Sequence, residues 1–180
     1  MIFPGSLDGR VGIMLWRLLS VIMIILSPEV AHAVTLWETY SVDRFGTMVE
    51  APSDWTEQKS ADGGEYQFTS PDGKAIIVVS GGLNALDTIS NAFGIYEKPQ
   101  PGETITDRHL DKWGITISGK KDGRFFLRRS MLSCDNKLWN SVSIEYPPSQ
   151  KNRFEPITNV VTRSLRFRLQ SSTEVKECKS

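Results

Sequence analysis

The chain has 180 residues, of which 39% are hydrophobic and 23% are charged, a composition typical of a folded globular protein and unlike that of a disordered or membrane-embedded one. Lysine and arginine together number 21, as do aspartate and glutamate, so no basic excess supports binding to nucleic acid or to an anionic membrane surface. We therefore expect one domain after any targeting segment, and no nucleic-acid partner.

Residues 1–33 show the three regions of a secretory signal peptide. Arg10 and Arg17 precede an apolar run at residues 18–26, and Ala31-His32-Ala33 forms a small-x-small cleavage site. The run is shorter than the roughly 20 residues that span a bilayer. We predict cleavage after Ala33, a periplasmic or secreted protein, and no stable membrane span after cleavage.

Two alternatives stay open at this end of the chain. An uncleaved membrane anchor is one, and a translation start at Met14, which would give a more compact leader, is the other. No cysteine lies near the cleavage point, so we do not expect a lipid-anchored protein.

The first strand after the leader is predicted where apolar and β-branched residues alternate and then meet Pro52. The residues on its shared face are Phe45, Thr47, Val49 and Ala51. Residues 53–55 are predicted to form a loop whose Trp55 indole folds back onto the core. Residues 59–65 contain Asp-Gly-Gly and are predicted to form an exposed turn.

A short strand is predicted at residues 66–70, followed by a tight turn at Pro71-Asp72-Gly73. Residues 75–79 then form an apolar run without polar interruption, which favours a central strand covered on both faces. Gly81-Gly82 is predicted to close that strand.

A helix is predicted to begin after Asp87 and to end before Pro99 and Pro101. Its apolar positions, at helical spacing, are Ile89, Ala92, Phe93 and Tyr96. Residues 104–106 are predicted to form a brief strand.

Three consecutive strands, at residues 113–118, 125–133 and 138–146, form the predicted centre of the fold. In the third strand two sets of residues alternate, which predicts an antiparallel sheet with one packed and one wetter face. The first set is Leu138, Val142, Ile144 and Tyr146, and the second is Trp139, Ser141, Ser143 and Glu145.

A second helix is predicted at residues 149–165, with Pro156 dividing an initial turn from the helix proper. Its predicted apolar face is Phe154, Ile157, Val160, Val161 and Leu165. The fold class is therefore α+β, an antiparallel sheet with flanking helices. We expect one globular domain at residues 34–169 and a polar C-terminal tail at residues 170–180.

Several residues, in this order, resemble a family of small secreted bacterial proteins of uncharacterised function. The matching residues are Thr39-Tyr40, Arg44-Phe45-Gly46, residues 68–75, Trp113 with Ser118-Gly119, Cys134 and Tyr146-Pro147. That family in turn is similar to the α/β/α sandwich shared by the photosystem II extrinsic protein PsbP and a nuclear transport factor that binds Ran. The resemblance spans nearly all of the chain after residue 33. It implies a PsbP-like sandwich used for docking to partners, with no catalytic residue and no cofactor.

Cys134 and Cys178 are the only cysteines. An even count in an oxidising compartment predicts a disulfide between them, which would hold the polar tail. Two alternatives stay open: pairing of Cys178 with another chain, and Cys134 as a nucleophile activated by His109, the only histidine after residue 33.

Three weaker patterns have ordinary structural interpretations. Ser118-Gly119-Lys120-Lys121 matches the S-x-x-K motif of penicillin-recognising enzymes, but there the serine begins a helix and here we predict a hairpin. Asp62, Glu65 and Asp72 offer oxygen ligands for calcium, yet both aspartates precede a glycine, as in turns. The tryptophans are scattered, which favours core packing over a sugar or peptide platform. We therefore predict no catalytic, metal or cofactor-binding site.

These observations favour a periplasmic or secreted non-enzymatic module that binds a protein or an envelope component. The alternative is a small cell-envelope enzyme, most plausibly a hydrolase, which would need a convergent cluster of ionisable groups in a cleft.

Overall fold

The computed structural model describes residues 35–86, 89–111, 113–133 and 135–168. The chain divides into one unit at residues 1–34 and a second at residues 35–180, and all described residues belong to the second. The predicted signal peptide, the polar tail and both cysteines lie outside the described residues, so their predictions stay untested.

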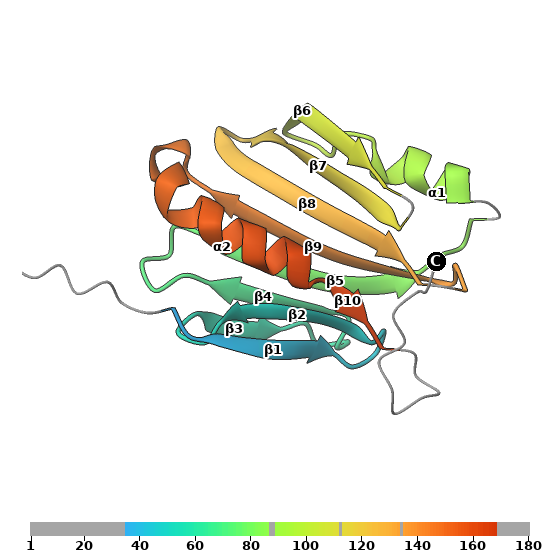
Figure 1. Ribbon diagram of the computed structural model, residues 1–180, viewed down its shortest axis with the longest axis horizontal. Helices are drawn as coiled ribbons and strands as arrows, with labels where there is room; N and C mark the ends of the chain where they lie inside the picture. Colours follow the sequence, from blue (N-terminus) through green and yellow to red (C-terminus); the bar gives the residue numbers. More distant parts are fainter. Residues whose placement is uncertain (1–34, 87–88, 112, 134, 169–180) are drawn as a thin grey trace, which may run out of the picture. The chain divides into compact units, whose positions relative to one another are not determined.

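A seven-stranded antiparallel sheet forms the centre of the described fold (Figure 1). Its spatial order is β3 (Thr56–Lys59), β4 (Glu65–Thr69), β5 (Ile76–Leu83), β9 (Leu138–Tyr146), β8 (Arg124–Leu132), β7 (Gly114–Lys121) and β6 (Glu103–Leu110). A separate three-stranded sheet has the order β1 (Trp37–Val42), β2 (Thr47–Pro52) and β10 (Arg166–Phe167). The described helices are α1 (Ile89–Tyr96), the single 3₁₀ turn η1 (Pro148–Gln150) and α2 (Lys151–Ser164).

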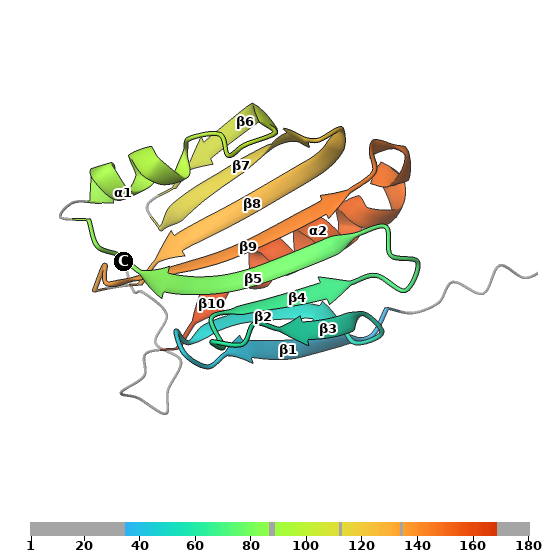
Figure 2. The ribbon, with the colours of Figure 1, turned by 180° about the vertical axis from the view of Figure 1, so that it is seen from behind.

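The two faces of the seven-stranded sheet differ in what lies against them. The covered face, which includes Ile77, Val79, Val142, Ile144 and Tyr146, packs against α2 and the three-stranded sheet. The open face presents the alternate residues of the same strands. Figure 2 shows that among the described elements only α1 lies on the open face, at one end of the sheet.

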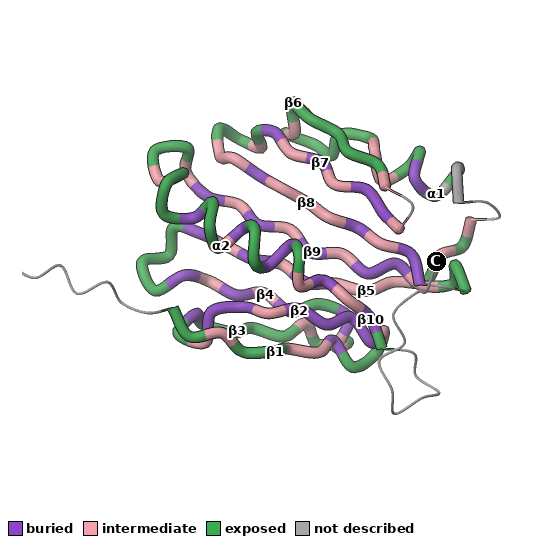
Figure 3. Tube along the Cα trace, in the orientation of Figure 1, coloured by how far each residue is buried: buried purple, intermediate pink, exposed green. Residues whose placement is uncertain are grey.

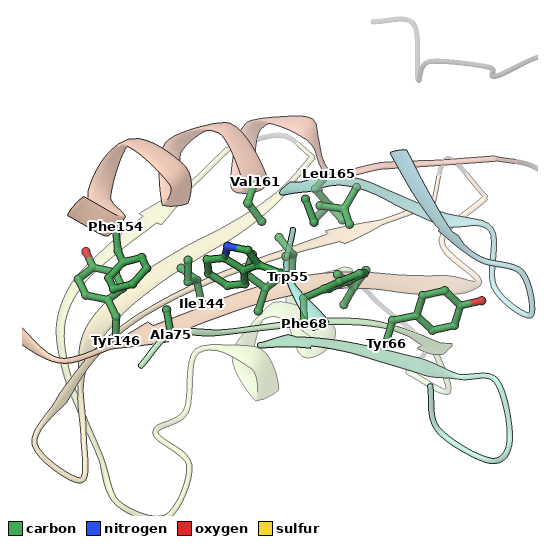
Figure 4. Packing of buried hydrophobic residues seen from close by; sticks show 14 of the residues in the cluster. Trp55, Tyr66, Phe68, Ala75, Ile144, Tyr146, Phe154, Val161 and Leu165 are labelled. Carbon is green, nitrogen blue, oxygen red and sulfur yellow. The ribbon is translucent and has the colours of Figure 1, made fainter. Parts of the chain in front are cut away.

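The covered face carries the main core. Trp55 is buried and meets the Phe154 ring edge-on, at a centroid distance of 6.1 Å, as predicted for its loop. The Phe154 ring also packs 5.5 Å from that of Tyr146 (Figure 4). These contacts fix α2 on β9, because aromatic pairs add specific geometry to the burial of apolar surface.

Three hairpin turns share one construction, with a serine, an aspartate two residues later and a positive φ at the next residue. In each turn the serine hydroxyl donates to the aspartate Oδ1 at 2.6–2.7 Å and accepts from a backbone N–H five residues on. The positive-φ residues are Gly63, Gly73 and Asn136. The turns link β3 to β4, β4 to β5 and β8 to β9.

Most predicted strands are confirmed, and β9 matches its predicted bounds. Three strands were missed, β1, β3 and β10; β3 is wholly exposed, so no hydrophobic alternation marks it, and β10 has only two residues. The prediction that Gly81-Gly82 closes the central strand is wrong, because β5 continues through both glycines to Leu83. Gly81 has a packing reason: a Cβ there would lie 2.3 Å from Cβ of Phe45. The prediction that this strand is covered on both faces is also wrong, since Ile76 and Val78 are only half-buried.

The second helix differs from its prediction in two ways. Pro156 lies inside a continuous α2, where it removes one hydrogen bond to the exposed Asn152 in the first turn. Val160 lies outside the packed face, at 37% exposure, while Thr158 and Thr162 are buried. Both threonine hydroxyls donate to the carbonyl four residues earlier, at 2.8 and 2.7 Å, which satisfies them inside the core.

Candidate functional site

The sequence-predicted site residues do not converge within the described chain. Cys134 and Cys178 are not described. His109 is exposed on the edge strand β6, opposite Thr116. Ser118 lies within β7 and leads into the predicted hairpin, so the S-x-x-K match lacks its helical context.

Of the three acidic residues considered for calcium, Asp62 and Asp72 pair with arginines, and Glu65 has no ion-pair partner among the described residues. Asp62 accepts from Ser60 and Gly64 and pairs with Arg44 at 3.0 Å. Asp72 accepts from Ser70 and Lys74 and pairs with Arg153 of α2. Within the described ranges no group of three or more His, Cys, Asp or Glu side chains is placed to hold a metal ion. The aspartates therefore organise turns.

The open face contains a cluster that the sequence analysis did not single out. Registered neighbours on β4, β5, β9 and β8 form two transverse rows across it. The first row is Glu65, Ser80, Ser141 and Ser130, and the second is Gln67, Val78, Ser143 and Arg128. At a strand spacing of about 4.8 Å, each row spans about 14 Å.

Two ion pairs form a wall beside these rows, on the side of β7 and β6. Arg128 Nη1 donates to Glu103 Oε1 at 2.8 Å, and the two side chains are 12% and 2% exposed. Glu103 Oε2 also accepts from the backbone N–H of Gln100 at 2.8 Å, which fixes the loop before β6. Lys121 donates to Glu145 at 2.9 Å and is a third exposed. The wall is therefore charged, but each of its two cations is paired with a glutamate.

Short side chains between larger ones hollow out this surface. A groove of about 310 Å³ lies over the rows, between Phe126 and the ion pairs on one side and β4 on the other. Its lining includes Glu65, Val78, Ser80, Gln100, Glu103, Lys121, Phe126, Arg128, Ser141, Ser143 and Glu145. We call this feature the open-face groove.

Two shallower hollows adjoin the open-face groove through shared residues. One, of about 510 Å³, shares Glu65 and Ser80 and continues past Phe45 toward Asp62. The other, of about 350 Å³, shares Gln100 and Arg128 and runs beside Tyr96 at the end of α1. The recessed surface thus extends beyond the central rows in both directions.

A second, smaller core lies on the open face along β7, β8 and the start of β9, where Ile117, Phe126, Leu132 and Trp139 are buried together with Phe93 of α1. Trp139 packs against Phe93 at 5.7 Å and Tyr96 at 3.8 Å between ring centroids. Beyond this cluster the strands are half-buried on this face, as the alternating colours of β5 and β9 in Figure 3 show. The alternation of Trp139, Ser141, Ser143 and Glu145 predicted a wetter face. The last three residues border the groove, but the prediction is wrong for Trp139, which is buried because the α1 rings cover it.

The chemistry available in the groove is hydrogen bonding and charge pairing. The hydroxyls of Ser80 and Ser143 have no hydrogen-bond partner among the described residues, and Ser141 donates to Ser130 at 2.8 Å. None of these serines contacts an imidazole in the described part of the chain, so no nucleophile–base pair forms there.

Comparisons with known proteins agree with the fold. No protein-family model matches the sequence, and no curated protein matches it. The solution structure of cyanobacterial PsbP (CyanoP) from Synechocystis sp. PCC 6803 is similar to this chain with a TM-score of 0.54 and 10% identity, over 77% of this chain and 96% of that one. A crystal structure from Bacteroides thetaiotaomicron VPI-5482 has a TM-score of 0.45 and 16% identity, over 71% of this chain and 47% of that one. The similarity to CyanoP confirms the PsbP-like α+β fold.

No described helix has the length and apolar character needed to cross a membrane.

Proposed function

We propose that this chain, which has the PsbP-like fold, is a periplasmic or secreted non-enzymatic module that binds a protein or an envelope component. The observation that carries the proposal is the open-face groove, a recessed polar surface on a rigid antiparallel sheet. Rigid sheets hold hydrogen-bonding side chains in fixed positions, which favours recognition of a partner. The leader-like residues 1–33 support export.

A binding role accounts for the groove better than hydrolysis does. The described carboxylates of the wall, Glu103 and Glu145, both accept from cations. A hydrolase would need a base beside one of the groove serines, and His109 is on the exposed edge strand β6 instead. The groove therefore offers contacts to a partner without a serine–imidazole pair among the described residues, and the carboxylate that lies opposite a groove serine, Glu65 beside Ser80, is exposed to water.

The test compares a groove-filled variant with the native protein. Ser143→Tyr places a ring between Val78 and Arg128, at a strand position that favours aromatic residues. The matched control is Thr39→Tyr, which adds the same ring at an exposed position of β1 in the three-stranded sheet.

Each exported protein is used as bait on envelope extract, and the captured proteins and glycans are quantified by mass spectrometry. We expect a defined component captured by the native protein and by Thr39→Tyr but lost with Ser143→Tyr, provided that thermal unfolding shows the variant is folded. Equal capture by all three proteins would contradict the groove as the binding surface. Turnover of chromogenic ester, amide or glycoside substrates that Ser143→Tyr abolishes would favour the hydrolase.

A further inference from the structure

The charges around the open-face groove are unequal at its two ends. At the end formed by β8 and β7, the cations Arg128 and Lys121 are each paired with a glutamate. At the β4 end, Glu65 is exposed and has no ion-pair partner among the described residues. The groove therefore carries one unneutralised carboxylate, which favours a ligand with a cation at that end.

The floor of the groove suits a peptide backbone. The side chains of Ser80, Ser143 and Gln100, which line the groove, supply both donors and acceptors. An extended peptide also presents both kinds of group and rises about 3.3 Å per residue, so about four residues cover a row of about 14 Å.

The aromatic residue of the groove argues against a sugar ligand. Sugar rings are held by stacking on an open aromatic face, whereas Phe126 is 2% exposed and the Arg128 guanidinium lies 5.8 Å from the centre of its ring. Phe126 is also the one aromatic residue lining the groove in the described part of the chain.

We infer that the open-face groove receives an extended segment of a partner protein, with a lysine or arginine side chain seated at Glu65. This inference rests on the proposed binding function and names the chemistry of its partner. The segment lies across β4, β5, β9 and β8, bonded to the hydroxyl and carboxamide side chains, and its basic residue supplies the charge that the β4 end lacks.

The experiment measures fluorescence anisotropy of labelled short peptides with the exported protein. The peptides share one extended, serine- and threonine-rich sequence and carry lysine, arginine, norleucine or glutamate at a single central position. We expect the lysine and arginine peptides to bind more tightly than the norleucine peptide, by about two- to fivefold as for an exposed ion pair. Added salt should remove the difference.

Charge reversal at Glu65 provides the decisive variant. Glu65→Lys should reverse the order of affinities, so that the glutamate peptide binds best, and a misfolded protein could not produce that reversal. The matched control is Glu155→Lys on the exposed side of α2, which should leave the order unchanged.

Three results would overturn the inference. The first is no binding of any peptide to the native protein, and the second is binding whose order is indifferent to Glu65→Lys. The third is binding of soluble cell-wall glycans in place of the peptides. If Ser143→Tyr abolishes capture from envelope extract while Glu65→Lys has no effect on it, the proposed binding function stands and the basic segment does not.

Discussion

The two faces of the seven-stranded sheet are built from neighbouring residues of the same strands, yet they differ in how far they are buried. On β5, Ile77 and Val79 are buried beneath α2 and the three-stranded sheet, whereas Ile76 and Val78 are half-buried on the open face. On β9, Val142 and Ile144 are buried, while Ser141 and Ser143 border the groove.

Under the proposed binding function, this difference separates residues that stabilise the fold from residues that contact the partner within one strand. The covered face is filled by branched and aromatic side chains, which stabilise the fold through burial. At the alternate positions of β5 and β9 the open face has the short hydroxyl side chains of Ser80, Ser141 and Ser143, and these leave a recess. Changes at these serines should therefore alter binding at little cost in stability, under the proposed function.

Alanine substitution of adjacent isoleucines tests this separation most directly. Ile77 is 0% exposed on the covered face and Ile76 is half-buried on the open face. We expect Ile77→Ala to lower the free energy of unfolding by about 2–5 kcal/mol, because it leaves a cavity. Ile76→Ala should cost about 1 kcal/mol, because much of its surface is already in water. Urea unfolding measures both, and equal losses would mean that the open face is covered in solution.

The buried ion pair is the exception that sharpens the comparison, since it lies on the open side. Arg128→Met leaves the Glu103 carboxylate, 2% exposed, without its cation. We expect a loss of about 3 kcal/mol in the free energy of unfolding, because an unpaired buried charge is costly. The double variant Arg128→Met with Glu103→Gln should recover part of that loss. A single variant as stable as the native protein would show that water already solvates this pair.

Adjacent glycines of β5 give a smaller but cleaner contrast. A Cβ at Gly81 would lie 2.3 Å from Cβ of Phe45, while a Cβ at Gly82 would meet nothing within 4 Å. We expect Gly81→Ala to destabilise the protein by about 1–3 kcal/mol through overpacking. Gly82→Ala should be neutral or stabilise it by up to about 1 kcal/mol, because alanine restricts the unfolded chain. Thermal unfolding measures the stability of both variants. If Gly82→Ala were less stable than Gly81→Ala, that result would contradict the packing of Phe45 on β5.

The sequence predicted β9 well, because the alternation of apolar and polar residues along a strand is a local signal. The bounds of β9 and the burial of Trp55 followed from neighbouring residues alone. The burial of Thr158 and Thr162 did not, because their hydroxyls are satisfied within α2 by bonds that the hydrophobic pattern does not reveal.

The groove could not be located from the sequence, because its rows join residues from four strands. Glu65 and Ser130 lie in the same transverse row although they are far apart in the chain, and only the strand order brings them together. One signal was available: the serines of β9 alternate with buried residues. The shared serine–aspartate turn was also visible, as Ser60-x-Asp62, Ser70-x-Asp72 and Ser133-x-Asp135, and would have predicted three hairpins of one type.

The smallest expected effect concerns Asp72, a residue of the β4–β5 turn that forms an ion pair with α2. The pKa of Asp72 is lowered from 3.8 to about 2, first by the hydrogen bond from Ser70 and then by the Lys74 N–H and Arg153. Arg153 belongs to α2, so the same carboxylate closes the turn and contacts the covering helix.

Because the folded state favours ionised Asp72, this carboxylate stabilises the protein above pH 3.8, and that contribution is lost as the pH falls toward about 2. We expect Asp72→Asn to unfold at lower urea than the native protein at neutral pH, and the two midpoints to converge through this window. Ser70→Ala should weaken the pH dependence of stability that Asp72 provides more than Arg153→Gln does. The reason is that the Ser70 hydrogen bond is the largest cause of the lowered pKa of Asp72. A larger effect from Arg153→Gln would instead show that contact with α2, and not the turn, holds Asp72 ionised in acid.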